Sequence, residues 1–276
     1  MLHVRRLDAA EFAAEVIPKL AEREVENNLL IGIAERALAQ TDGGADAVLA
    51  VVESHGEILG AVVCTPPRLP VVSRLPGGGA HALAEFFAGL GDLPEGAIGP
   101  DAHGQALARE LAERRGRSID LASDELIYEL RAVHPPRPPE GFARMATIAD
   151  VPVLTRYMSE FFREVALPHP PDPVTMAAAV VEQQRALLWD DNGVRSMACT
   201  ARRTPTGTAL APVYTPPNAR RRGYASAVTA ELCQRLLDSG NRFVCLHADR
   251  KNETSNRIYR TIGFRHVADL NVWTIR

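Results

Sequence analysis

The sequence predicts a mixed α/β fold built from two similar modules, and two observations support that prediction. Extended segments alternate with helical ones along the whole chain, and the order of segments in the first half returns in the second. Between the halves, four of the five residues 135–139 are proline, a residue that cannot continue a helix or a central strand. We therefore place a boundary near residue 138, which gives modules 1–138 and 139–276. The alternative is one α+β domain with accidental echoes.

Each module begins with a short extended segment followed by a helix start. Residues 4–7 are expected to form a strand, and Asp8 is a candidate N-cap with Glu11 at the spacing of a capping box. In the second module an extended segment at 144–146 precedes Thr147, and Asp150 follows at the same spacing. This recurrence favours an internal duplication.

A strand–turn–strand pattern also occurs once in each module, over 48–65 and over 186–200. In the second copy the turn contains Asn192-Gly193, which indicates a hairpin because both central positions of a type I′ turn need a positive φ. The two hairpins end alike, on Cys64-Thr65 and on Cys199-Thr200.

Composition and charge exclude several classes of protein. The 276 residues carry a formal net charge of −3, so the whole molecule is not a binder of polyanions. The apolar run 47–52 is too short to span a bilayer, and the first residues have no apolar signal-peptide core. The four cysteines are scattered without metal-ligand spacing. We expect a reduced, cytoplasmic protein that binds neither metal nor membrane.

The second module contains a turn suited to a phosphate group. A predicted strand, 209–215, is ended by two prolines and followed by an arginine-rich turn, and a helix with one apolar stripe continues to about Gly240. The first turn of a helix has unsatisfied N–H groups and partial positive charge, and Gly223 permits close backbone approach. The alternative, a solvated basic turn before an ordinary surface helix, is equally compatible with this segment alone.

A further strand and a short helix follow. Residues 242–248 read as a buried strand, and Asn252 or Thr254 can cap the helix that comes next. Asn256 and Tyr259 are three residues apart and share one helix face, and Gly263 is expected to end the helix. Tyr259 can also be read as an amphipathic residue at a helix edge without a chemical role.

These two segments together resemble a known family. Arg220-x-x-Gly223-x-Ala225 resembles the acyl-CoA signature of the GCN5-related N-acetyltransferases (GNAT), Gln/Arg-x-x-Gly-x-Gly/Ala, and Asn252, Tyr259 and Gly263-Phe264 follow in that family's order. The resemblance spans Phe142 to Arg276. It implies two GNAT-like modules in tandem, each a mostly antiparallel sheet with a splayed parallel pair flanked by helices. The first module resembles a degenerate copy, because 99–106 lacks the signature.

The resemblance also implies a role for each site residue. Backbone N–H groups of the turn would hold the pyrophosphate of acetyl-CoA, the cosubstrate, while the strand before the turn would pair with the pantetheine arm and diverge from the strand ending near Ala248. Asn252 would contact the pantetheine or anchor its loop, and Tyr259 would act as general acid at the sulfur. The residues implied in cofactor binding are Val213, Thr215, Arg220, Arg221, Arg222, Gly223, Tyr224, Ala225, Ser226 and Asn252.

The implied reaction is transfer of an acetyl group to a primary amine, which attacks the thioester directly. The amine must first lose a proton because an alkylamine has a pKa of about 10. The sequence does not identify the general base, which is either a side chain or an ordered water. The acidic and histidine candidates are Glu160, Glu164, Asp190, Asp191, His247 and Asp249.

Two other functions compete with acetyl transfer. One is an acyl-CoA-binding regulatory or scaffold protein without turnover. The other is nucleic-acid binding through 202–203 and 220–222, which the negative net charge and the lack of interleaved aromatic residues disfavour. We expect a small-molecule or peptide amine as acceptor, no nucleic-acid partner, and a monomer or homodimer.

Overall fold

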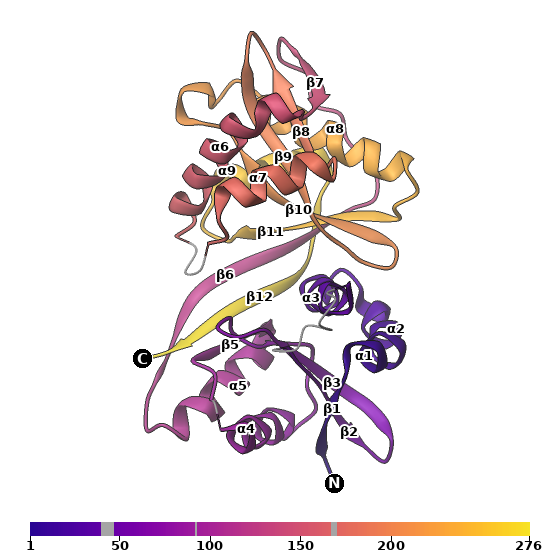
Figure 1. Cartoon of the computed structure of the whole chain (residues 1–276), viewed down its shortest axis with the longest axis vertical. Helices are drawn as coiled ribbons and strands as arrows, with labels where there is room; N and C mark the ends of the chain where they lie inside the picture. Colours follow the sequence, from indigo (N-terminus) through magenta and orange to yellow (C-terminus); the bar gives the residue numbers. More distant parts are fainter. Residues whose placement is uncertain (40–46, 92, 167–169) are drawn as a thin grey trace. The chain divides into compact units, whose positions relative to one another are not determined.

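The computed structural model describes residues 1–39, 47–91, 93–166 and 170–276 (Figure 1). The chain forms two compact units. The first unit contains Met1–Ile127 together with Ala248–Lys251 and Val267–Arg276, and the second contains Tyr128–His247 and Asn252–His266.

The first unit has a helical segment before its central strands and further helices after them. Its elements are β1 (His3–Leu7), α1 (Ala9–Glu15), α2 (Ile17–Leu20), the 3₁₀ turn η1 (Ala21–Arg23), α3 (Asn28–Ala39), β2 (Val48–Ser54), β3 (Glu57–Cys64), β4 (Val71–Val72), α4 (Gly79–Leu90), β5 (Gly96–Pro100), α5 (Asp101–Glu113), β6 (Ile119–Leu130) and the end of β12 (Arg265–Ile275).

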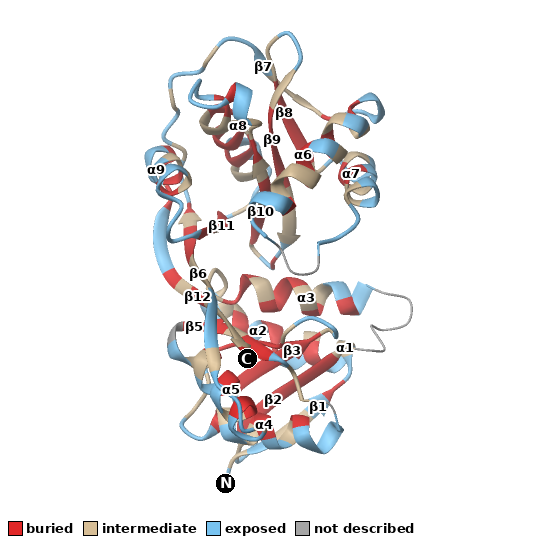
Figure 2. Ribbon diagram, turned by 90° about the vertical axis from the view of Figure 1, so that its left-hand side faces the viewer, coloured by how far each residue is buried: buried red, intermediate tan, exposed pale blue. Residues whose placement is uncertain are grey.

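The first unit is a sheet with helices on both faces. The strand order is β1-β2-β3-β4-β5-β12-β6, and β4 and β5 form its parallel pair, matched only at Val71 and Ile98. β2 is apolar on both faces: Leu49 and Val51 pack against α1, α2 and α3, whereas Ala50 and Val52 pack against α4 and α5. This explains its continuous hydrophobic run, and Figure 2 shows buried residues along these strands.

The second unit repeats that order of elements. They are β7 (Phe142–Met145), the 3₁₀ turn η2 (Ile148–Asp150), α6 (Val151–Glu164), α7 (Pro173–Glu182), β8 (Ala186–Asp190), β9 (Val194–Arg203), β10 (Gly207–Tyr214), η3 (Pro217–Ala219), α8 (Tyr224–Asp238), β11 (Phe243–Asp249) and α9 (Glu253–Ile262).

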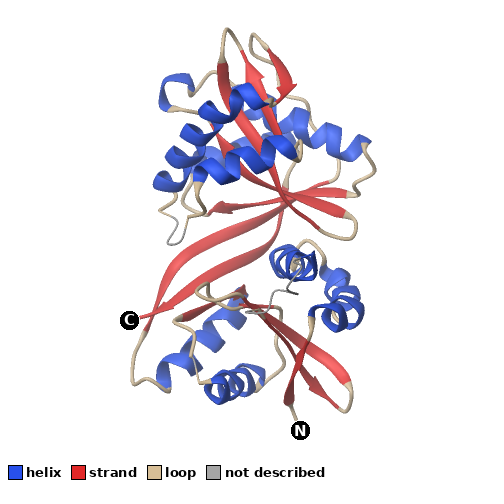
Figure 3. Ribbon diagram, viewed as in Figure 1, coloured by secondary structure: helices blue, strands red, loops and turns tan. Residues whose placement is uncertain are grey.

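The sheet of the second unit runs in the order β11-β10-β9-β8-β7. Only β10 and β11 are parallel; β7, β8, β9 and β10 form antiparallel neighbours (Figure 3). Leu154, Tyr157 and Met158 of α6 pack with α7 on the face that bears Leu188 and Met197. The predicted mixed α/β fold is therefore confirmed, and each unit contains one parallel strand pair.

The local predictions at the helix starts and hairpins are confirmed. Asp8 caps α1 in a capping box with Glu11, and Thr147 forms the same box with Asp150 at η2. Asn192 and Gly193 have φ values of 52° and 115°, as the predicted turn requires. The first hairpin uses His55 and Gly56 in the same way, with φ values of 52° and 81°.

The compact units differ from a division of the sequence at residue 138. β12, the last strand of the chain, pairs antiparallel with β5 from Leu270↔Pro100 to Thr274↔Gly96. Its residues Val267–Arg276 therefore belong to the first unit, although they come last in the sequence. Strand pairing between residues this far apart leaves no signal in local composition.

Candidate functional site

The turn before α8 presents a row of backbone N–H groups. Arg221 and Gly223 both have left-handed backbone, with φ values of 65° and 86°, and Gly223 is the N-cap of α8. No side chain caps the helix, and its first intrahelical bond runs from the Ala227 N–H to the Gly223 carbonyl. Within the described residues, the amides from Arg221 to Ser226 donate to no other group. Such a run of unpaired amides in alternating conformations forms an anion-binding concavity.

The turn is open to an approaching ligand. Arg221, Arg222 and Gly223 are exposed, and a Cβ on Gly223 would come no nearer than 4.0 Å to a neighbour, the Pro139 Cδ. Ala225 and Ser226 are half-buried and small. A phosphate group therefore meets no steric block at this turn, and a diphosphate fits the donors present.

Arg220 and Tyr224 fix the turn from either side. The Arg220 guanidinium donates to the Thr215 carbonyl (Nε–O 2.9 Å), and its Nη2 donates to both carboxylate oxygens of Glu164 (2.6 and 2.8 Å). Tyr224 is buried and its hydroxyl donates to Asp191, a contact that raises the pKa of the phenol. The side chains of Arg220 and Tyr224 therefore hold the turn in place. Any contact that these two residues make with the predicted ligand would involve their backbone N–H groups.

β10 and β11 separate before β10 reaches the turn. They are paired from Gly207↔Phe243 to Leu210↔Leu246, while β10 continues to Tyr214 and β11 to Asp249. On its other edge β10 stays paired with β9, with a shift of register between Leu210 and Val213. Beyond Leu210, β10 therefore has no strand partner among the described residues on the edge that faces away from β9, as the splay predicted from the resemblance requires, and the Thr215 carbonyl is the group there that already accepts from Arg220.

Asn252 and Tyr259 lie on α9, which packs against α8. Asn252 is the N-cap of α9 and accepts a hydrogen bond from the Ser255 N–H at 3.0 Å, so its observed contact is structural. Tyr259 is buried beside Tyr128 and Phe264, with ring centroids at 6.3 and 5.7 Å. Burial raises the pKa of its phenol, which therefore stays protonated.

A second polar group forms at the end of β10, where sequence reasoning missed Tyr214. Its hydroxyl lies 3.0 Å from Glu160 Oε2 and 3.2 Å from Glu164 Oε1, and burial together with these carboxylates raises the pKa of the phenol. One hydroxyl proton faces two carboxylates, and Arg220 neutralises only Glu164. The group carries a net charge of −1, which attracts a cation.

Other candidate bases are engaged in structure. Asp190 is held by Arg144 and by the Gly193 N–H, and both contacts lower its pKa. Asp191 accepts the hydroxyl proton of Tyr224, and Asp249 accepts the Lys251 N–H at 2.8 Å. The hydrogen bonds of these three carboxylates stabilise neighbouring turns. No group of three or more metal-ligating side chains occurs in the described residues.

The chain is similar to a known protein family and to several solved structures. Residues 191–274 match the model of the FR47-like protein family. A Drosophila melanogaster protein of known structure is 16% identical, with a TM-score of 0.70 over 99% of this chain and 98% of its own. A GCN5-related N-acetyltransferase from Sphaerobacter thermophilus is 19% identical, with a TM-score of 0.66 over 99% and 94%. The fold is that of the GNAT acetyltransferases.

The GNAT fold extends over the whole chain. A tandem GNAT protein of the clavulanic acid biosynthesis pathway is 16% identical, with a TM-score of 0.51 over 99% of this chain and 98% of its own. The resemblance stated from residues 220–225 and 252–264 is thereby confirmed for the fold. No curated protein matches the sequence. No helix in the described part of the chain is long and apolar enough to cross a membrane.

The GNAT topology also identifies the counterpart of the turn in the first unit. The sequence predicts that residues 99–106 of the first module correspond to the turn before α8, but in the structure they lie at the junction of β5 and α5. The strand–turn–helix unit equivalent to β10–α8 is β4–α4, and its turn reads Arg74-x-x-Gly77-x-Gly79. The signature spacing is therefore present in the first unit. Residues 71–72 form too short a strand to mark this turn from sequence.

Proposed function

We propose that this protein is an acyltransferase that moves an acetyl group from acetyl-CoA to a primary amine. The observation that carries the proposal is the row of unpaired amides from Arg221 to Ser226, reached directly from the strand edge at 213–215. The amides suit a diphosphate, and the free strand edge suits the amide groups of pantetheine. The GNAT fold of the second unit supports the same assignment.

Proton transfer in the proposed reaction needs a base for the amine and an acid for the thiolate. The amine arrives as an ammonium ion, and Glu160 is the proposed acceptor of its proton because Glu164 is neutralised by Arg220. The amine nitrogen then bonds to the acetyl carbon as the carbon–sulfur bond breaks, and the nitrogen loses its second proton to solvent, from which the Tyr259 phenol is later reprotonated. Tyr259 gives its proton to the departing sulfur, whose thiol has a pKa of about 8.5.

The experiment is the release of free thiol from acetyl-CoA, measured with and without a panel of primary amines. The panel contains a diamine, an amino sugar, an amino acid and a peptide with a free N-terminus. We expect thiol release that depends on one class of amine and equals the amide formed. Tight binding of acetyl-CoA without release by any amine would favour the alternative, an acyl-CoA-binding regulatory or scaffold protein.

A further inference from the structure

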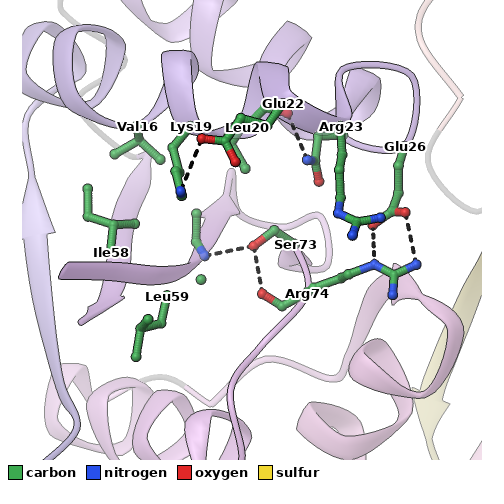
Figure 4. A pocket seen from close by; sticks show the side chains of 13 residues that line it. Val16, Lys19, Leu20, Glu22, Arg23, Glu26, Ile58, Leu59, Ser73 and Arg74 are labelled. Carbon is green, nitrogen blue, oxygen red and sulfur yellow. Dashed lines mark hydrogen bonds and ion pairs between the residues drawn. The ribbon is translucent and has the colours of Figure 1, made fainter. Parts of the chain in front are cut away.

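The first unit contains a pocket that the proposed acetyl transfer does not use. It lies where α2 and η1 face β3 and the residues after β4 (Figure 4), and its volume is about 150 Å³. A single bound water needs only about 10–15 Å³, so the pocket can hold a compact organic ligand.

The two ends of the pocket differ in chemistry. Val16, Leu20, Ile58 and Leu59 supply apolar surface, and Figure 4 shows Val16, Ile58 and Leu59 at the end opposite to Arg23, Glu26 and Arg74. Val16 is fully buried, whereas Leu59 remains 38% exposed at the rim. A ligand that covers Leu59 removes apolar surface from water, which favours binding.

The charges that line the pocket do not balance. Lys19 pairs with Glu22 at 3.0 Å, and Arg74 pairs with Glu26 through Nε and Oε1 at 2.8 Å. Arg23 has no carboxylate partner within the described residues. Three cations and two carboxylates leave one positive charge in excess, which calls for an anionic group on the ligand.

Asn27 adds an acceptor that lacks a donor. The side chain lines the pocket and is only 7% exposed, and its Nδ2 donates to the Leu20 carbonyl at 2.9 Å. Among the described residues, nothing donates to its side-chain oxygen. This oxygen is open to the pocket, so an N–H or O–H on a ligand can donate to it.

We propose that this pocket binds a small aliphatic carboxylate that carries one hydrogen-bond donor, the chemistry of a branched 2-hydroxy acid. The carboxylate pairs with Arg23, the donor faces the Asn27 side-chain oxygen, and the aliphatic group covers Ile58 and Leu59. The first unit is then a ligand-binding module in its own right, and this inference does not rest on acetyl transfer in the second unit.

The test is isothermal titration of the full chain, without acetyl-CoA, against three probes. They are 2-hydroxy-3-methylbutyrate, 3-methylbutyrate, which lacks the donor, and isobutylamine, which lacks the anion. We expect the first to bind, the second to bind about 10-fold more weakly because the Asn27 oxygen stays unpaired, and the third to give no heat of binding.

Variants identify the pocket as the binding site. Arg23→Gln is expected to weaken binding of 2-hydroxy-3-methylbutyrate by about 10-fold or more, because it removes the unpaired cation. Arg36→Gln, an exposed arginine on α3 outside the pocket, should leave affinity unchanged. Leu59→Asp, at the exposed rim, should abolish binding without disturbing the core.

Two results would overturn the proposal. One is the absence of binding by the wild-type chain to all three probes at millimolar concentration. The other is equal affinity in Arg23→Gln and wild type. Because no acetyl-CoA is present, either result leaves the proposed acetyl transfer untouched.

Discussion

The turns before α8 and before α4 share a spacing but differ in their free donors. Arg220-x-x-Gly223-x-Ala225 and Arg74-x-x-Gly77-x-Gly79 both follow a strand, and the N-caps Gly223 and Gly78 have φ values of 86° and 80°. In the turn before α8, no amide from Arg221 to Ser226 is used.

In the turn before α4, three of the six positions from 75 to 80 offer no free amide. The Leu75 N–H donates to His103 Nδ1 at 3.2 Å, and the Gly79 N–H donates to the Pro76 carbonyl at 2.9 Å. Pro76 itself has no N–H. The comparison shows that glycine spacing sets the path of the chain, whereas anion binding also needs N–H groups without internal partners.

The two units also differ at the helix that follows the parallel pair. Tyr259 lies seven residues after the N-cap Asn252 of α9, and the corresponding residue of α5, counted from the N-cap Pro100, is Leu107. Leu107 is fully buried in the core of the first unit and has no proton to give. We therefore expect both cosubstrate binding and turnover in the second unit alone.

A carboxylate placed in each turn tests whether acetyl-CoA binds at the turn before α8 alone. Gly223→Glu should lower the affinity for acetyl-CoA by more than about 100-fold, because it sets a negative charge against the phosphates. Gly78→Glu is the matched control: it creates the same left-handed strain, and a Cβ there meets Leu2 at an ordinary 3.6 Å. Titration calorimetry measures both. Loss of binding in Gly78→Glu but not in Gly223→Glu would place the acetyl-CoA site in the first unit and contradict the proposal.

Tyr259 separates turnover from binding. Tyr259→Phe should lower kcat by about 10- to 100-fold with the Kd for acetyl-CoA unchanged, because it removes one proton donor and no phosphate contact. Tyr128→Phe removes a hydroxyl from the ring beside it and should keep kcat. Steady-state rates and calorimetry together give the two quantities. Equal rates in Tyr259→Phe and wild type would remove Tyr259 from the mechanism.

Elements set by neighbouring residues were predictable from the sequence. The capping boxes at Asp8 and Thr147 and the turn at Asn192-Gly193 depend on side chains or φ values within four residues, and all three occur. The helix that begins after Gly223 and the cap at Asn252 have the same local origin. The roles given to Val213, Thr215 and the residues from Arg220 to Ser226 stay predictions.

Features that join distant segments were not predictable. Tyr214 meets Glu160 and Glu164 only because α6 crosses the end of β10, about fifty residues away in sequence, and no periodicity marks that contact. The pairing of β12 with β5 is of the same kind. The turn at 74–79 was overlooked for a different reason, because its strand has two residues and gives no alternating pattern.

The first residue of each turn forms an ion pair, and burial predicts which pair matters more. Glu26, the partner of Arg74, has a side chain 9% exposed, whereas Glu164, the partner of Arg220, is 45% exposed. Arg74→Gln leaves a nearly buried carboxylate unpaired and should cost about 2 kcal/mol of unfolding free energy. Arg220→Gln should cost about 0.5 kcal/mol.

The two tryptophans allow the loss of unfolding free energy to be measured separately in each unit. Trp273 lies in the first unit and Trp189 in the second, so Trp189→Phe and Trp273→Phe backgrounds each leave one fluorescent reporter. Urea unfolding in each background gives the two free energies. A larger loss for Arg220→Gln than for Arg74→Gln would contradict the argument from burial.

The last expected effect concerns the helix starts. Arg144 forms a bidentate pair with Asp150 at 2.8 Å and lowers the pKa of that carboxyl to about 2, whereas the capping box of α1 is exposed and makes no such ion pair through Glu11. An aspartate in an unfolded chain has a pKa of about 3.9, so the stabilisation is present above pH 4 and is lost as the pH falls toward 2.

Because the Arg144 side chain of the pair is 29% exposed and solvent screens it, the stabilisation should be about 1 kcal/mol. Asp150→Asn should therefore lower the unfolding free energy of the second unit at pH 6 and flatten its dependence on pH between 4 and 2. Glu11→Gln, the same change of charge at the exposed box, should leave the pH dependence of the second unit as it is. Urea unfolding followed through Trp189 measures both, and a pH profile of Asp150→Asn parallel to that of wild type would mean that other carboxylates dominate acid unfolding of this unit.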